Sequence, residues 1–176
     1  MPQANYFKHW KPNMNSVKSK RIDKANARYK FETALEEHEQ IFEHFFIAKL
    51  IGLEFEYLNF NCEDSNNEML NISFEVDPMF FNPQGTLHGG LIATVMDISM
   101  GHLLNKSIGP GATIEMKTQY IRSIVQGKIN CRASFIKKGR SINFLESRLF
   151  DENKKLCASA TSTWKLLQKK HFSGSK

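Results

Sequence analysis

Alternation of hydrophobic and polar residues runs through much of the chain and predicts β-strands. Six segments show the two-residue period of a strand that buries one face. Short linkers at Gly127, at Gly139 and over residues 151–153 separate the last strands, and linkers of this kind favour antiparallel hairpins. The predicted strands cover residues 51–60, 68–76, 111–122, 128–137, 140–150 and 155–167.

One long interruption of this alternation, residues 87–104, has a different pattern. Its apolar residues would cover most of the circumference of a helix, and a helix that is apolar nearly all round is a buried one. These residues are Leu87, Leu91, Ile92, Val95, Met96, Ile98, Met100, Leu103 and Leu104. The pattern predicts an α+β fold in which an antiparallel sheet of about six strands wraps around one central helix.

The segment before the first strand has apolar residues at helical spacing from Phe31 to Leu50, with glutamates on the other face. This pattern predicts an amphipathic helix over residues 28–50 that needs a partner surface. We expect that surface to be its own domain, with a membrane surface or a subunit contact as the alternatives. Residues 168–176 are expected to be a frayed tail.

Length and charge divide the chain further. The chain has 176 residues, which corresponds to about one domain, and residues 51–167 are expected to form it. The net charge is +6, but residues 1–30 hold eight Lys or Arg against one acid, which is +7 and leaves −1 for the rest. Residues 1–27 are therefore expected to be a basic, flexible arm. Contact of this arm with nucleic acid or membrane is the less favoured alternative.

Composition excludes several classes of protein at this stage. Cys62, Cys131 and Cys157 are odd in number and lack CxxC spacing, so neither a disulfide framework nor a zinc site is predicted. No apolar run reaches the roughly 20 residues that span a bilayer, and the polar N-terminus lacks a secretory signal. We expect a cytoplasmic protein without a metal or other cofactor.

Asp97 is the first candidate for chemistry. It is the only Asp, Glu, Lys or Arg between Pro78 and Asn105, in the middle of the predicted buried helix. A buried carboxylate is costly unless it is paired, hydrogen-bonded or protonated, and burial raises its pKa towards the range of a general base or nucleophile. The alternative is a carboxylate that serves as a hydrogen-bond anchor or subunit contact.

The start of the same helix is the second candidate. Residues 82–86 form a turn-rich approach, and His88, Gly89 and Gly90 open the helix. Two glycines at this point cost about 1 kcal/mol each relative to Ala, which is understandable if a ligand must approach the backbone closely. Free N–H groups at a helix N-terminus can stabilise a developing oxyanion. Close packing of the helix start against a strand is the alternative.

The spacing of these two candidates constrains any shared site. Gly89 and Asp97 are eight residues apart, so one helix separates them by about 12 Å. A carbonyl group and the water that attacks it span much less. If both groups act on one carbonyl, they come from two subunits, and a two-fold dimer would contain two such sites.

The run from Asn82 to Gly101, NPQGTLHGGLIATVMDISMG, resembles the signature of hotdog-fold acyl-CoA thioesterases, and most closely the phenylacetate-pathway and 4-hydroxybenzoyl-CoA type. The segments 114–116 and 138–141 are similar as well, and the resemblance covers about residues 50–167. It implies a hotdog fold, hydrolysis of an acyl-CoA to a free acid and CoA, and a homodimer. Pairing of dimers into a tetramer and the identity of the acyl group stay open.

The resemblance also implies roles for individual residues. Asp97 would be the general base or the nucleophile, and the N–H of Gly89, with that of Gly90, would polarise the thioester carbonyl. Asn82 would position the nucleophile or the thioester from the partner subunit. Thr113 would orient the attacking water, in an alignment that needs a two-residue gap.

A further set would contact the substrate. Lys137, Lys138 and Arg140 match positions that bind the phosphates of CoA in similar proteins, although a basic hairpin turn is the slightly preferred explanation for any single one of them. His88 belongs to the signature, with a side chain that is more often structural. The helix before the domain, with its cluster of phenylalanines, would cover the acyl pocket or a dimer surface.

Two other functions remain open from the sequence. A non-catalytic acyl-CoA binding or sensing protein would share the fold but would have no use for the Asn82, Gly89 and Asp97 set. A hotdog dehydratase would need a catalytic histidine with an acid, a role for which His88 is the candidate.

Overall fold

A computed structural model describes residues 22–60 and 67–167 of the chain. The predicted arm up to residue 21 and the tail from residue 168 lie outside these residues. Within the described ranges the elements are α1 (Lys24–Glu37), α2 (Phe46–Ile51), β1 (Glu54–Leu58), β2 (Met69–Glu75), the 3-10 helix η2 (Pro78–Phe80), α3 (Gly89–Ser107), β3 (Gly111–Tyr120), β4 (Lys128–Lys137), β5 (Ile142–Phe150) and β6 (Leu156–Leu166).

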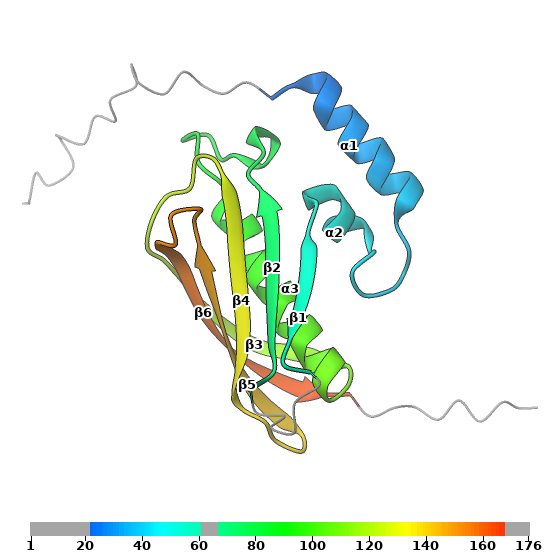
Figure 1. Cartoon of the computed structure of the whole chain (residues 1–176), viewed down its shortest axis with the longest axis vertical. Helices are drawn as coiled ribbons and strands as arrows, with labels where there is room; N and C mark the ends of the chain where they lie inside the picture. The colour runs from blue at the N-terminus through cyan, green and yellow to red at the C-terminus, as the bar shows by residue number, and fades with distance from the viewer. Residues whose placement is uncertain (1–21, 61–66, 168–176) are drawn as a thin grey trace, which may run out of the picture.

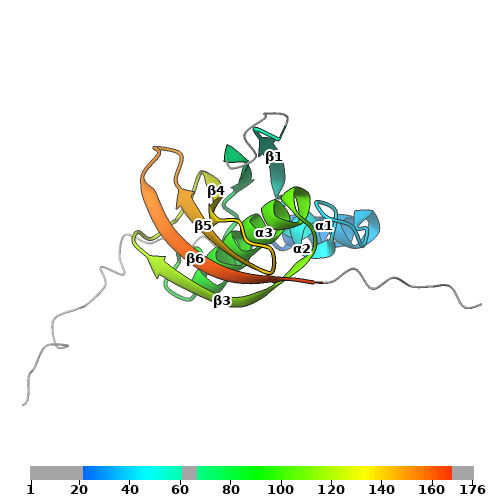
Figure 2. The ribbon, with the colours of Figure 1, turned by 90° about the horizontal axis from the view of Figure 1, so that it is seen from below.

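The six strands form one antiparallel sheet in the order β1-β2-β4-β5-β6-β3. The sheet curls around α3, with β1 at one end of the curl and β3 at the other (Figure 2). The predicted α+β architecture, an antiparallel sheet wrapped around one central helix, is therefore confirmed. Both β1 and β3 are edge strands, since each has one neighbour in the sheet.

Burial of α3 explains why its sequence is apolar on nearly all sides. Its core-facing side chains, among them Val95, Met96 and Met100, have no exposed surface. Each fully buried side chain of this size contributes roughly 1.5–3 kcal/mol. Gly101 allows α3 to approach β6, because a Cβ atom at this position would lie 2.8 Å from the ring of Trp164.

The prediction of one helix over residues 28–50 was wrong. Helix α1 begins at Lys24, because the Asp23 side chain accepts hydrogen bonds from the first N–H groups and caps the helix. The chain leaves helical geometry after Glu37, and Glu43, with φ of +72°, interrupts any continuation. A separate short helix, α2, follows.

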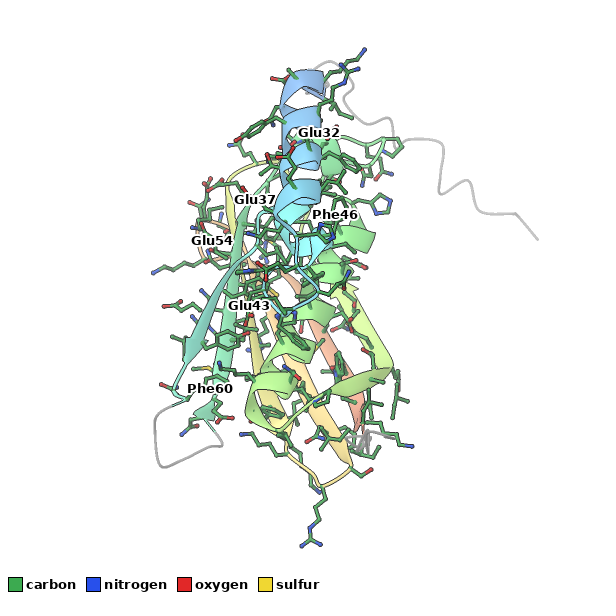
Figure 3. All side chains as sticks on the ribbon, turned by 90° about the vertical axis from the view of Figure 1, so that its right-hand side faces the viewer. Glu32, Glu37, Glu43, Phe46, Glu54 and Phe60 are labelled. Atoms are coloured by element: carbon green, nitrogen blue, oxygen red, sulfur yellow. The ribbon has the colours of Figure 1, made fainter. Side chains whose placement is uncertain are left out.

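Helix α1 is also less buried than an amphipathic helix would be. Only Ala34 is buried, whereas Tyr29 and Leu35 are exposed. Figure 1 shows α1 beside the sheet rather than on it, and Figure 3 shows Glu32 and Glu37 along α1 with Phe46 of α2 below. Phe46 packs against the ring of Phe31.

The loop between α1 and α2 contacts α3. Phe42 and Phe45 pack against the ring of His102, and Phe55 of β1 stacks on its other side. In the same loop, Glu43 accepts a short hydrogen bond from Tyr57 of β1. The phenylalanines of this region therefore cover the side of α3 that faces β1.

None of the helices in the described ranges is both long enough and apolar enough to cross a membrane.

Candidate active site

Asp97 lies in the middle of α3, half-buried, on the side of the helix that faces β3. The Thr113 hydroxyl donates a hydrogen bond of 3.0 Å to its carboxylate. Burial raises the pKa of Asp97 above its usual value, and the hydrogen bond from Thr113 offsets part of that rise. The sequence-predicted pair of Asp97 and Thr113 is thus brought together by the fold.

A bulge in β3 sets the position of Thr113. The pairing with β6 shifts between Thr113 and Glu115, so that Ile114 is an extra residue and is exposed. A bulge of this kind reverses which residues of a strand face inward. Before it Thr113 faces α3, and after it Met116 and Tyr120 do. A regular strand would place Ile114 on the same face as Met116, whereas the bulge leaves Ile114 exposed.

The start of α3 is the second part of the site. Gly89 is the first residue of the helix, so its N–H has no acceptor within the helix. In the described part of the chain no hydrogen bond from this N–H is formed. The hydroxyl of Tyr120 donates to the Gly89 carbonyl at 3.0 Å, and the same ring lies against the glycine.

Gly90 differs from Gly89. Its N–H donates to Nδ1 of His88 at 2.9 Å, and His88 is the N-cap of α3. Of the two N–H groups predicted to form an oxyanion site, only that of Gly89 is available in this geometry. The imidazole of His88 is occupied as a helix cap, which is a structural role.

Asn82 organises the loop that leads to α3. Its Oδ1 accepts hydrogen bonds from the N–H groups of Gln84 and Thr86, and its Nδ2 donates to the Thr86 hydroxyl. An asparagine that bonds to backbone two residues ahead forms an Asx turn. These bonds leave one of the two Nδ2 hydrogens without a described acceptor.

A cavity of about 300 Å³ lies beside the start of α3, and Asp97 and Thr113 are not among its lining residues. Asn82 and Gly89 line it, together with Tyr120 and the segment 121–124 that follows β3. Its apolar side is formed by Leu87, Ile92 and Ile124. Tyr120 and Arg122 were not predicted as site residues, because nothing in the local sequence distinguishes them from other residues in or beside an alternating strand.

The basic hairpin lies at the other end of α3. Lys138 pairs with Glu68 at 2.6 Å, and Glu68 accepts a hydrogen bond from Ser107, the last residue of α3. The ring of Phe135 lies under the Lys138 ammonium. Ser107 and Gly89 are 18 residues apart, which is about 27 Å along a helix.

Within one chain, the basic hairpin is therefore far from the Gly89 N–H at the start of α3. Lys137 and Arg140 on the same hairpin are exposed, whereas most of the Lys138 side chain is covered. Among the described residues, no group of three His, Cys, Asp or Glu side chains could hold a metal ion.

Comparison with known proteins identifies sequences and folds similar to this chain. Residues 84–158 match the family model of the thioesterase superfamily. A putative esterase of Saccharolobus solfataricus is 24% identical over 120 residues, which are 67% of this chain and 75% of that protein. The medium/long-chain acyl-CoA thioesterase YigI of Escherichia coli is 24% identical over 141 residues, covering 66% of this chain and 91% of YigI.

Solved structures share the fold. A protein of Bacillus halodurans determined with CoA superposes with a TM-score of 0.71 at 17% identity, over 86% of this chain and 98% of that one. Zebra fish thioesterase superfamily member 2 superposes with a TM-score of 0.58 at 26% identity, over 67% of this chain and 83% of that one. Residues 84–158 therefore resemble the thioesterase superfamily in sequence, and the chain shares the hotdog fold of the solved structures.

Proposed function

We propose that the protein is an acyl-CoA thioesterase whose active sites each combine Asp97 of one subunit with Gly89 of another. The observation that carries this proposal is the separation of two complementary groups on one helix. A half-buried carboxylate and a free helix-terminal N–H lie eight residues apart, about 12 Å, too far to serve one carbonyl from one chain.

A two-fold homodimer through β3 supports such a site. Strand β3 pairs with β6 on one side, and its other edge has no strand beside it in the described chain. Such an edge offers unpaired N–H and C=O groups to another strand. Antiparallel pairing of two β3 strands would set the two α3 helices side by side in opposite directions, with Asp97 of each near the glycines of the other.

The reaction then follows from the residues present. The Gly89 N–H would donate to the thioester oxygen and stabilise the negative charge that forms when the carbonyl is attacked. Asp97, held by Thr113, would take a proton from the attacking water. The C–S bond breaks as the carbonyl re-forms, and the CoA thiolate takes up a proton to leave as the thiol.

Asp97 can also act as the nucleophile. Its carboxylate would then attack the thioester directly and expel the CoA thiolate, which takes up a proton, to form an anhydride. Water would hydrolyse this anhydride at the Asp97 carbonyl carbon, which releases the free acid and regenerates the carboxylate. Single-turnover hydrolysis in ¹⁸O-labelled water separates these routes, because only the nucleophilic route transfers the label into the Asp97 carboxylate. The local geometry is compatible with both.

We propose that the basic hairpin binds the phosphates of CoA from the partner subunit. Lys137 and Arg140 are exposed, and the antiparallel arrangement of two α3 helices would bring this end of one subunit close to Gly89 of the other. The CoA-bound Bacillus halodurans structure, which shares the fold, supports a CoA ligand. Lys138 would contribute charge while its Glu68 ion pair fixes the hairpin.

The acyl group is proposed to be a medium or long aliphatic chain. Leu87, Ile92 and Ile124 form the apolar side of the cavity next to Gly89, and Arg122 is the charged residue in its lining. The relative YigI is a medium/long-chain acyl-CoA thioesterase, which supports the same class. A panel of acyl-CoAs of increasing chain length, assayed with a thiol reagent, tests this assignment.

The proposal is tested by matched variants at the two groups. Asp97→Asn keeps the shape and an oxygen acceptor for Thr113 but removes the base, and kcat should fall by about 10²- to 10⁴-fold. Gly89→Pro removes one N–H at the first helical position, where proline is well tolerated, and kcat should fall by about 10²- to 10³-fold.

The control for Gly89→Pro is Gly89→Ala, which keeps the N–H and adds a Cβ atom at ordinary contact distance from Tyr120. Unchanged turnover of the Asp97→Asn protein would refute the catalytic assignment. Acyl-CoA binding without turnover by the unmodified protein would favour the binding or sensing function instead.

A further inference from the structure

Helix α1 lies outside residues 84–158, yet it is attached to the segment that precedes the active site. Nζ of Lys30 lies 2.6 Å from Oδ2 of Asp77, and Nδ2 of Asn26 donates to the same oxygen at 3.2 Å. The exposed fractions of the Lys30 and Asp77 side chains are 32% and 12%. The ion pair is therefore partly withdrawn from water, where a charge-assisted hydrogen bond is stronger than at an open surface.

Asp77 in turn fixes the turn that follows it. Its second carboxylate oxygen accepts a hydrogen bond from the Met79 N–H at 2.9 Å and so caps η2. Burial raises the pKa of Asp77, but the bonds from Lys30, Met79 and Asn26 outweigh it and hold the pKa below its usual value. The carboxylate is thus charged at neutral pH, as its ion pair with Lys30 requires.

The turn η2 is connected directly to the start of α3. The N–H of His88 donates to the Phe80 carbonyl at 3.0 Å, and Phe81 pairs with Leu87 as an isolated β-bridge. His88 is the N-cap of α3 and holds the Gly90 N–H. The residues on either side of Gly89 both have hydrogen-bonded N–H groups: that of His88 bonds to Phe80 of η2, and that of Gly90 bonds to the His88 side chain. The position of the Gly89 N–H between them is therefore set in part by η2.

We propose that Lys30 and Asp77 are positioning residues for the oxyanion site: the ion pair fixes η2, and η2 fixes the direction of the Gly89 N–H. This inference rests on the proposed function, since it assigns a role to the Gly89 amide. Helix α1 contributes to catalysis in this way without touching the substrate. A displacement of about 1 Å at a catalytic donor can cost up to 10²-fold in rate.

A merely structural role for the ion pair predicts different behaviour. In that case its loss would lower the free energy of unfolding and leave kcat of the folded protein unchanged. The positioning role predicts a fall in kcat that depends on the presence of the Gly89 N–H. The two roles are separable because Gly89→Pro deletes that N–H.

The variant Lys30→Met removes the ion pair and keeps the length of the side chain. At a temperature where it is folded, we expect kcat to fall about five- to tenfold with KM changed less than about twofold, and Lys30→Arg to restore most of the loss. Lys49→Met is the matched control, because Lys49 links α2 to Glu37 of α1 by an ion pair of 3.6 Å without contacting Asp77. Its kcat should equal that of the unmodified protein.

The decisive experiment is a double-mutant cycle. In the Gly89→Pro background, Lys30→Met should cause no further fall in kcat, whereas equal losses in both backgrounds would overturn the proposal. If Lys30→Met does not fold, Asp77→Asn replaces it, because Asn retains an oxygen for the Met79 N–H and loses the charge that pairs with Lys30.

Amide hydrogen exchange gives a readout that does not depend on the proposed activity. Loss of the ion pair should speed exchange of the His88 and Met79 N–H groups while leaving the exchange of the middle of α3 unchanged. Unchanged exchange at His88 would overturn the inference even if the protein is a thioesterase. If Asp97→Asn leaves turnover intact, the proposed function itself has failed, whatever Lys30 does.

Discussion

Thr113 and Tyr120 face α3 from the same side of β3, although they are seven positions apart. In a regular strand an odd separation places two side chains on opposite faces. The bulge at Ile114 removes this conflict, so that one strand contacts both Asp97, through Thr113, and Gly89, through Tyr120. The two reactive groups of α3 are thereby held by the same neighbouring strand.

The hydroxyl of Thr113 provides the first prediction. Thr113→Val keeps the volume and β-branching and removes the donor to Asp97, so kcat should fall by about tenfold. Thr113→Ser, which retains the hydroxyl, should retain most of the activity. The measurement is steady-state hydrolysis of one acyl-CoA; equal rates for the Val and Ser variants would show that this hydrogen bond has no role in turnover.

The pH dependence of the reaction provides the second prediction. Burial raises the pKa of Asp97, and only its deprotonated form can act as base or nucleophile. The value of kcat/KM should therefore rise with pH through an apparent pKa above about 3.9, the usual value for Asp. Because Thr113 lowers this pKa, Thr113→Val should move the profile to higher pH. A shift to lower pH would contradict the assignment of the titrating group.

Replacing Asp97 by Asn should raise the stability of the fold although it lowers activity. A carboxyl with a raised pKa binds its proton more tightly in the folded state, so it contributes stability at low pH that is lost as the pH rises through the folded pKa. At neutral pH the buried charge of Asp97 is therefore destabilising. Asp97→Asn removes this charge and should raise the free energy of unfolding at neutral pH. Urea unfolding of the two proteins at neutral pH measures the difference.

His102 gives a prediction that is independent of catalysis. It is 6% exposed, its Nδ1 has no hydrogen-bond partner in the described structure, and burial lowers its pKa to about 4, opposed by the charge of Glu43. As the pH falls, His102 is protonated at a higher pH in the unfolded chain than in the folded one. The free energy of unfolding therefore decreases as the pH falls from about 6.5 towards 4. His102→Phe should therefore be more stable than the unmodified protein by about 2 kcal/mol near pH ~5.

Chemical denaturation across that pH range measures this effect. At neutral pH, where His102 is uncharged in both states, the variant and the unmodified protein should differ much less. A constant difference at all pH values would mean that packing against Phe55 and Phe42, and not protonation, accounts for the change.

The sequence was sufficient for the sheet and α3, and insufficient where tertiary contacts decide the local geometry. Apolar residues on all sides of residues 87–104 predicted burial, and Asp97 was conspicuous as the lone acid within them. The bulge at Ile114 depends on pairing with β6, so no local pattern reveals it. The hydrogen bond from the Gly90 N–H to His88 likewise depends on the rotamer of His88, which the sequence does not specify.

The break between α1 and α2 has a similar origin. Helical spacing of apolar residues continues through residues 38–45, but the contacts of Phe42 and Phe45 with His102 favour a turn there. The start of α1 was readable in principle, because Asp23 is a strong N-cap residue. Its attachment to the active-site segment through Lys30 and Asp77 joins residues 47 positions apart and is visible only in the fold.

The central claim, that each active site is shared between two subunits, is tested most directly by complementation. The Asp97→Asn chain retains Gly89, and the Gly89→Pro chain retains Asp97, so a dimer of one with the other has one complete site and one doubly defective site. When the two chains are co-expressed in equal amounts, half of the dimers are mixed, and turnover should recover to about a quarter of the unmodified level. If both groups of a site belonged to one chain, the mixed preparation would remain as inactive as its parents.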